Sequence, residues 1–272
     1  MNKIFPNNIF QALLLLGIGI VATAPIIFIT QSYFDDLSVD IIANIMFIVF
    51  CIATISFAKV MNSRRKLDNN YRFTLPRNSP TLIGLTILII IIFQVGVNAP
   101  LSNMLSYYQK GKLQLTNPFA QIQLFLGAVF LAPFFEEVIF RGTILKGFLT
   151  KYNPTLSIIL SSVLFCAIHI QPVQLFGALF FGILSGWIYY RSESLGLCIF
   201  LHFLSNLSSQ FISFLLFKAT IYENLSPLYS YGQYTFFFIG ISVLILSFLT
   251  FKLAGRLVKP KLISSTTHSA ED

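Results

Sequence analysis

Two adjacent glutamates lie inside an apolar stretch of the sequence, residues 131–142, which reads LAPFFEEVIFRG. Ionisable groups inside spanning helices cost roughly 2.5–3.5 kcal/mol each, so such groups mark sites or pathways by default. Glu137 and Arg141 are four residues apart and share a helix face, where their charges can pair. Glu136 points about 100° away from that face, which leaves it as the candidate general base. In the alternative, both glutamates extend to the membrane interface near Arg141.

Two of the three histidines lie in apolar segments, and each has a second notable residue one helical turn away. Phe165 precedes His169 by four residues and Asn206 follows His202 by four, which places each pair on one helix face. Taken singly, either histidine could instead form a hydrogen bond between helices, and Phe165 could be a core residue. The third histidine, His268, lies in a polar tail and is expected to be solvated.

Spacing along the chain brings these residues to similar depth. Glu136 lies about 16 residues before a predicted turn at residues 152–154, and His169 lies about 17 residues after it. At about 1.5 Å per residue, the two reach comparable depth on neighbouring antiparallel helices, and His202 is roughly 10 Å deep in a later helix. The helix before His169 is short, so the loop at residues 171–172 must lie within the bilayer. Such a loop is tolerated only where it is buried in protein or lines a cavity.

The elements that must position these residues are membrane helices. Hydrophobic residues make up 56% of the 272-residue chain and charged residues only 10%, whereas a soluble domain usually carries roughly 25% charged residues. An apolar run of about 20 residues crosses the hydrocarbon core as a helix. We therefore predict an all-α integral membrane protein with eight transmembrane helices, at residues 10–30, 40–57, 81–99, 119–140, 155–170, 173–190, 195–217 and 234–253.

The predicted helices form one polytopic membrane domain, residues 1–254, followed by a polar tail at residues 255–272 that is expected to be disordered. The candidate site residues fall on the fourth, fifth and seventh helices. On the sixth helix, Gly177, Gly182 and Gly186 provide small residues of the kind that allow close helix packing.

The net charge of +8 does not indicate a nucleic-acid partner, because that requires a clustered basic face and these cations lie between apolar runs. Cytoplasmic loops of membrane proteins carry an excess of Lys and Arg. The distribution places both chain termini in the cytoplasm. The cations assigned to that side are Lys3, Lys59, Arg64, Arg65, Lys66, Arg72, Arg77, Arg141, Lys146, Lys151, Arg191, Lys252, Arg256, Lys259 and Lys261.

Taken in order, the Glu-Glu-x-x-x-Arg, Phe-x-x-x-His and His-x-x-x-Asn patterns resemble the three-motif signature of the CPBP family. This family comprises the type II CAAX prenyl endopeptidases and bacterial relatives often called Abi proteins. Each pattern alone is a weak signal, but all three occur in order and in separate predicted membrane helices. The resemblance covers about residues 119–217, and the chain agrees with the signature at each of its positions.

The resemblance implies a division of labour among the signature residues. Glu136 and His169 would activate a water for attack on the scissile carbonyl. His202 and Asn206 would stabilise the oxyanion that forms. The remaining signature residues would hold the site together, and these are Glu137, Arg141 and Phe165.

The family is sometimes described as zinc-dependent. In that case Glu136, His169 and His202 would be the ligands, with one position left for water. The HExxH helix that makes such sites recognisable is absent from the sequence. We therefore favour a water activated by glutamate, with no metal or other cofactor.

Together with the apolar composition, the resemblance implies an intramembrane endopeptidase, expected in the bacterial plasma membrane. Its expected partners are the bilayer and a membrane-adjacent or lipid-linked peptide substrate. One alternative is a non-catalytic membrane scaffold, or a bacteriocin-immunity-type protein, with the same fold. A second alternative is a proton-coupled transporter in which the Glu/His cluster relays protons. The sequence shows none of the paired broken helices that are typical of transporters, which argues against this second alternative.

Overall fold

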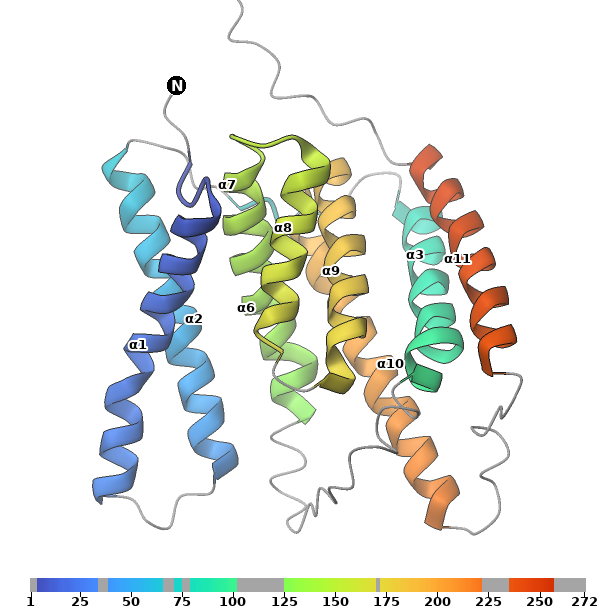
Figure 1. The fold of residues 1–272 in the computed structure, drawn as a ribbon, viewed down its shortest axis with the longest axis horizontal. Helices are drawn as coiled ribbons and strands as arrows, with labels where there is room; N and C mark the ends of the chain where they lie inside the picture. The colour runs from blue at the N-terminus through green and yellow to red at the C-terminus, as the bar shows by residue number, and fades with distance from the viewer. Residues whose placement is uncertain are drawn as a thin grey trace, which may run out of the picture.

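The computed structural model describes residues 4–33, 39–65, 71–74, 79–101, 125–169, 172–221 and 235–256. Within these ranges the chain forms eight successive helices and no strand (Figure 1). The first three are α1 (Ile9–Tyr33), α2 (Val39–Arg64) and α3 (Ser79–Phe93), the last of which continues into the π-helical turn η1 (Gln94–Asn98). The fourth helix is continuous and consists of η2 (Gly127–Leu131), α6 (Ala132–Glu137), η3 (Val138–Leu145) and α7 (Lys146–Phe148). The remaining four are α8 (Pro154–Ala167), α9 (Pro172–Ser192), α10 (Leu195–Ile221) and α11 (Thr235–Arg256).

The helices are arranged as a central group between two flanking pairs (Figure 1). α1 and α2 pack together on one flank, and α3 packs against α11 on the other. The fourth helix, α8, α9 and α10 lie between them. The described chain begins and ends at the same end of the bundle, which is also the end where α7 leads into α8 and α9 into α10. Most of the predicted tail, residues 257–272, lies outside the described residues.

The helix lengths match a membrane-embedded protein. Within the described ranges, five helices are long and apolar enough to cross a membrane, over Ile9–Thr30, Ile41–Arg64, Ile83–Leu101, Leu195–Ile212 and Phe236–Leu253. α8 is apolar but has only 14 residues, about 21 Å at 1.5 Å per residue, which is shorter than a hydrocarbon core of about 30 Å. The predicted all-α membrane fold is therefore confirmed, and so is the short fifth helix. Residues 170–171 of the turn that follows lie outside the described residues.

The fourth helix extends further than the sequence predicts. We expected it to end at Phe140, but it continues to Phe148, so Arg141 is inside the helix and only 1% exposed. Counting Arg141 among the loop cations is therefore wrong. The alternative in which both glutamates extend to the interface is also wrong, because Glu137 is fully buried. The ion pair between Glu137 and Arg141 explains both differences, since it balances the arginine charge and lets the helix continue through the core.

Close packing of α8 against α9 depends on the predicted glycines. A Cβ added to Gly182 would contact the backbone and side chain of Ser162, and one added to Gly186 would contact Ile158. These contacts confirm that small residues allow the two helices to approach closely. α8 itself begins at an N-cap, where the side chain of Asn153 accepts a hydrogen bond from Leu156 N–H at 2.9 Å.

Residues 71–74 lie across the fourth helix and the start of α10. The hydroxyl of Tyr71 is 3.1 Å from that of Thr143 in η3. The N–H of Leu195 donates to the carbonyl of Arg72 at 2.8 Å, and Ser194 Oγ donates to the carbonyl of Thr74 at 2.6 Å. This segment therefore joins two of the helices that carry the predicted site.

Candidate active site

The fourth helix presents the two glutamates where α6 meets η3, just after a proline that interrupts its hydrogen bonding. Pro133 has no N–H to donate to the preceding turn. Ala132 N–H donates to Gly127 O, five residues earlier, which is the π-helical register. In this register residue 133 would donate to Ala128 O. Because residue 133 is a proline, that carbonyl has no donor within its own helix. The Nδ2 amide of Asn206 on α10 donates to this carbonyl at 2.8 Å. This hydrogen bond ties α10 to the turn that precedes the glutamates.

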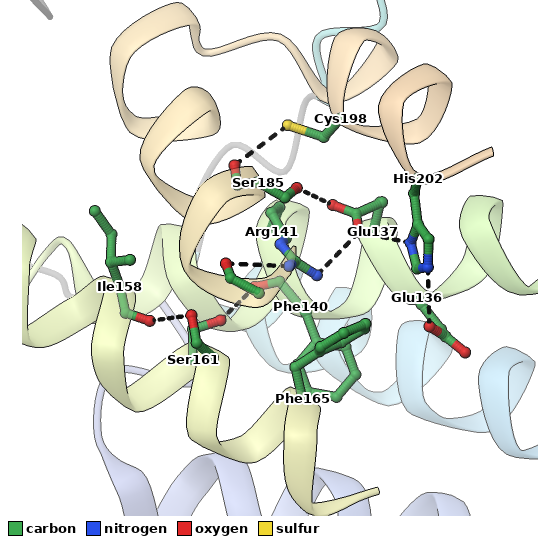
Figure 2. A network of polar contacts seen from close by, with 12 residues as sticks. Glu136, Glu137, Phe140, Arg141, Ile158, Ser161, Phe165, Ser185, Cys198 and His202 are labelled. Atoms are coloured by element: carbon green, nitrogen blue, oxygen red, sulfur yellow. Dashed lines mark hydrogen bonds and ion pairs between the residues drawn. The ribbon is translucent and has the colours of Figure 1, made fainter. Parts of the chain in front are cut away.

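Glu137 is the centre of a buried polar network (Figure 2). Its Oε1 lies 2.9 Å from the guanidinium of Arg141 and accepts a hydrogen bond from Nδ1 of His202, also at 2.9 Å. Its Oε2 accepts a hydrogen bond from Ser185 Oγ at 2.8 Å. The i,i+4 pairing with Arg141 is as the sequence predicts. The bonds from His202 and Ser185 are further findings, and together the three partners satisfy both oxygens of this carboxylate.

His202 connects the two carboxylates. A carboxylate paired with Arg141 only accepts hydrogen bonds, so the imidazole Nδ1 carries the hydrogen that it shares with Glu137. The other ring nitrogen, Nε2, faces Glu136 at 3.8 Å. Within the described part of the chain, Glu136 makes no hydrogen bond, and this ion-pair contact is the one that it forms. The two adjacent glutamates therefore differ sharply in how they are held.

The ring of Phe165 packs against several polar groups of the site. It is 1% exposed, and the Arg141 guanidinium lies over it at 4.6 Å from the ring centroid, a favourable cation–π distance. The rings of His169 and His202 have centroids 4.8 and 5.8 Å from that of Phe165. Phe165 is thus a packing residue at the centre of the site, in contact with three of the polar signature residues.

His169 lies just beyond the end of α8, which stops at Ala167 and not at residue 170 as predicted. Its Nδ1 is 2.8 Å from the carbonyl of Phe165, one turn earlier. This contact leaves Nε2 as the ring nitrogen available to another group. Both imidazoles, His169 and His202, contact the ring of Phe165. The structure therefore brings the predicted residues of the fourth, fifth and seventh helices into one cluster.

Two buried polar residues near this cluster were not predicted from the sequence. Ser185 is 1% exposed and holds Glu137 from α9, and Gln94 is 5% exposed and contacts α10 from η1. A serine is common in apolar helices and gives little signal. Gln94 gives a clearer one, because it follows the run ILIIIIF directly, and a buried amide in such a run needs a hydrogen-bond partner.

The two histidines that would hold zinc each use Nδ1 in another hydrogen bond, which leaves Nε2 as the nitrogen that could bind a metal. Nδ1 of His202 bonds to Glu137, and Nδ1 of His169 bonds to the carbonyl of Phe165. Among the described residues, no three His, Cys, Asp or Glu side chains are grouped in a way that could hold a metal ion. The arrangement of Glu136 and the two histidines thus does not fit a three-ligand zinc site.

A buried Glu/His/Arg cluster inside an all-helical membrane bundle marks a functional site, because ionisable groups are expensive there unless they are shielded from lipid. Residues 118–208 match the family described as type II CAAX prenyl endopeptidase Rce1-like. This segment contains all seven signature positions, and the match confirms the resemblance to CPBP-family intramembrane proteases over these residues. No curated protein and no solved structure matches the chain.

Proposed function

We propose that this protein is an intramembrane endopeptidase that hydrolyses a peptide bond with a water activated by Glu136 and His169. Glu136 takes a proton from the water as its oxygen adds to the scissile carbonyl carbon. The C–N bond then breaks, and the proton passes to the leaving nitrogen, so the products are one carboxylate and one amine. The Glu/His pair thus serves first as base and then as acid.

In this proposal His202 and Asn206 stabilise the oxyanion that forms during attack. Donors held in a water-poor site are worth several kcal/mol against developing negative charge, about 2.7–4 for one donor. His202 is held by Glu137 through Nδ1, which directs Nε2 toward Glu136. In this proposal Nε2 also carries a hydrogen, so that it can donate to the oxyanion. The Asn206 amide is bonded to Ala128 O through Nδ2, and its second N–H is the one that we assign to the oxyanion.

The observation that carries the proposal is the contrast between the two glutamates. Both oxygens of Glu137 are occupied by Arg141, His202 and Ser185, which suits a structural anchor. Among the described residues, Glu136 keeps only a 3.8 Å contact with an imidazole, which suits a base that must gain and release a proton. A scaffold has no need for such a contrast within one helical turn.

The substrate class that we propose is a membrane-adjacent or lipid-linked peptide. The family match is to CAAX prenyl endopeptidases, and the cluster lies among apolar helices, so a substrate reaches it from the bilayer or its surface. Besides this substrate, the partner that we propose is the lipid bilayer itself.

We propose that neither a metal nor another cofactor takes part, because the candidate ligands do not form a three-ligand group. Purified protein should therefore cleave a membrane-peptide library equally well before and after treatment with a zinc chelator. A Glu136→Gln sample serves as the inactive control in the same assay. Stoichiometric zinc that is lost together with activity would contradict this proposal and would make Glu136, His169 and His202 the ligands.

We also propose that both termini lie in the cytoplasm of a bacterium, on the basis of the Lys and Arg distribution. A reporter fused after Asp272, and another inserted between Lys59 and Arg77, should then report the cytoplasm. A reporter inserted at residues 101–117 should report the opposite side. A cytoplasmic signal from this last position would contradict the proposed orientation and the eight-helix count.

A further inference from the structure

Two amide side chains, one buried and one partly buried, lie one turn apart in the third helix, which packs against the helix that carries His202. Gln94 is 5% exposed and stands with Asn98 in the π-helical turn η1. Both belong to the span Ile83–Leu101, whose mean hydropathy is 2.1. An amide in such surroundings is tolerated when its hydrogen bonds are satisfied by neighbouring helices. The partners of this pair therefore indicate what it does.

Gln94 makes a forked contact with α10. Its Nε2 donates to both the carbonyl oxygen and the hydroxyl of Ser205, each at 3.1 Å. Its Oε1 accepts a hydrogen bond from Asn98 Nδ2 at 2.8 Å. Asn98 thus fixes the orientation of the Gln94 amide, so that its two N–H groups are directed at Ser205.

Ser205 lies between the two site residues of α10. His202 is three positions before it and Asn206 is the next residue, and these two bond to Glu137 and to the Ala128 carbonyl of the fourth helix. One turn of α10 is therefore held by the fourth helix on one side and by Gln94 of the third helix on the other. A displacement of this turn would move the imidazole and the amide together.

The third helix can act as a fixed support because it also packs closely against two other helices. A Cβ added to Gly96 would contact Ser242 of α11, and one added to Gly177 of α9 would contact the side chain of Asn98. Glycine at both positions permits this close approach. η1 therefore cannot shift toward or away from α10 without disturbing two other helices.

We infer that Gln94 is a positioning residue, which sets the place of the His202–Asn206 turn relative to Glu136. The inference rests on the proposed function, since it assigns Gln94 a role in that same site. A simpler role, as a hydrogen bond that only joins α3 to α10, predicts a loss of stability without any change at His202. The two roles therefore differ in a property that can be measured directly.

The variant that tests the inference is Gln94→Met, which keeps the length and removes all three hydrogen bonds. Ser205 O still accepts from Ser208 Oγ, and the freed Ser205 hydroxyl can bond within its own helix, so the variant is expected to fold. We expect kcat to fall roughly 10–100-fold, because a small misplacement of catalytic groups has effects of this size. KM should stay near its wild-type value. The melting temperature should fall modestly, because Asn98 Nδ2 loses its acceptor. The matched control is Thr23→Val on α1, whose buried hydroxyl donates to Ile20 O of its own helix. This control should leave kcat, KM and the melting temperature unchanged.

A second readout does not require peptidase activity. The chain has three histidines, so ¹⁵N-histidine labelling with His169→Gln and His268→Gln references assigns the ring nitrogens of His202 by NMR. Gln94→Met should move the His202 signals while Thr23→Val leaves them in place. Unchanged His202 signals in folded Gln94→Met would overturn the inference, whatever the activity does.

If Gln94→Met does not fold, Gln94→Asn takes its place, because it keeps an amide that is too short to span to Ser205. The same movement of the His202 signals is expected, and unchanged signals again overturn the inference. If wild-type protein cleaves nothing, the proposed function fails, and the NMR comparison alone decides whether Gln94 positions His202. The two failures can therefore be told apart.

Discussion

The Glu136→Gln variant is expected to lose turnover while keeping its fold. Gln has the same shape as Glu but cannot take a proton from water, and loss of a general base typically lowers the rate by about 10²–10⁴. Within the described part of the chain, Glu136 makes no hydrogen bond that the substitution would break. The melting temperature in detergent should therefore stay close to that of the wild type.

The experiment compares purified wild-type and variant protein in a peptide-library cleavage assay and in thermal unfolding. Glu193→Gln is the matched control, because this glutamate is more than half exposed and its partner is the exposed Arg72 at 3.7 Å. An exposed pair of this kind contributes little to stability, so the control should keep both activity and melting temperature. If Glu136→Gln retains full activity, the peptidase proposal is wrong, and a membrane scaffold becomes the better account.

Those parts of the site that depend on local spacing were predictable from the sequence. The Glu137–Arg141 ion pair follows from a separation of four residues on one helix. The shared face of His202 and Asn206 follows in the same way, and both contact the fourth helix as that face requires. The helical class follows from apolar runs long enough to cross a bilayer.

Contacts between distant parts of the chain were not predictable. The bond from Ser185 to Glu137 spans 48 residues and that from Gln94 to Ser205 spans 111. Such pairs depend on how the helices rotate and pack, and the sequence pattern fixes neither. The π-helical turns had no sequence signal either, although they shift the register of α3 and of the fourth helix.

The burial of Arg141 shows how one contact changed the larger prediction. A lone arginine after an apolar run is typical of a loop, and this led us to end the fourth helix at Phe140. The pairing with Glu137 was itself predicted, yet its consequence for helix length was not. The ion pair offsets much of the cost of burying the arginine charge, so the helix continues through Arg141 within the core.

The Glu137→Gln variant is expected to be unstable, in contrast to Glu136→Gln. It would leave the Arg141 guanidinium, 1% exposed, without its countercharge. Removal of one partner of a buried ion pair costs about 3–5 kcal/mol, because the other charge stays buried and uncompensated. The same substitution weakens the bond that directs His202, so activity should fall along with the melting temperature.

A double variant, Glu137→Gln with Arg141→Met, separates the two effects. Methionine removes the uncompensated charge and fills similar space beside Phe165, so the double variant should recover a large part of the stability lost in the single one. Its activity should stay low, because the carboxylate that holds His202 is still missing.

Equal instability of Glu136→Gln and Glu137→Gln would instead mean that the two carboxylates form one structural unit. In that case the assignment of a base to one and an anchor to the other would be wrong.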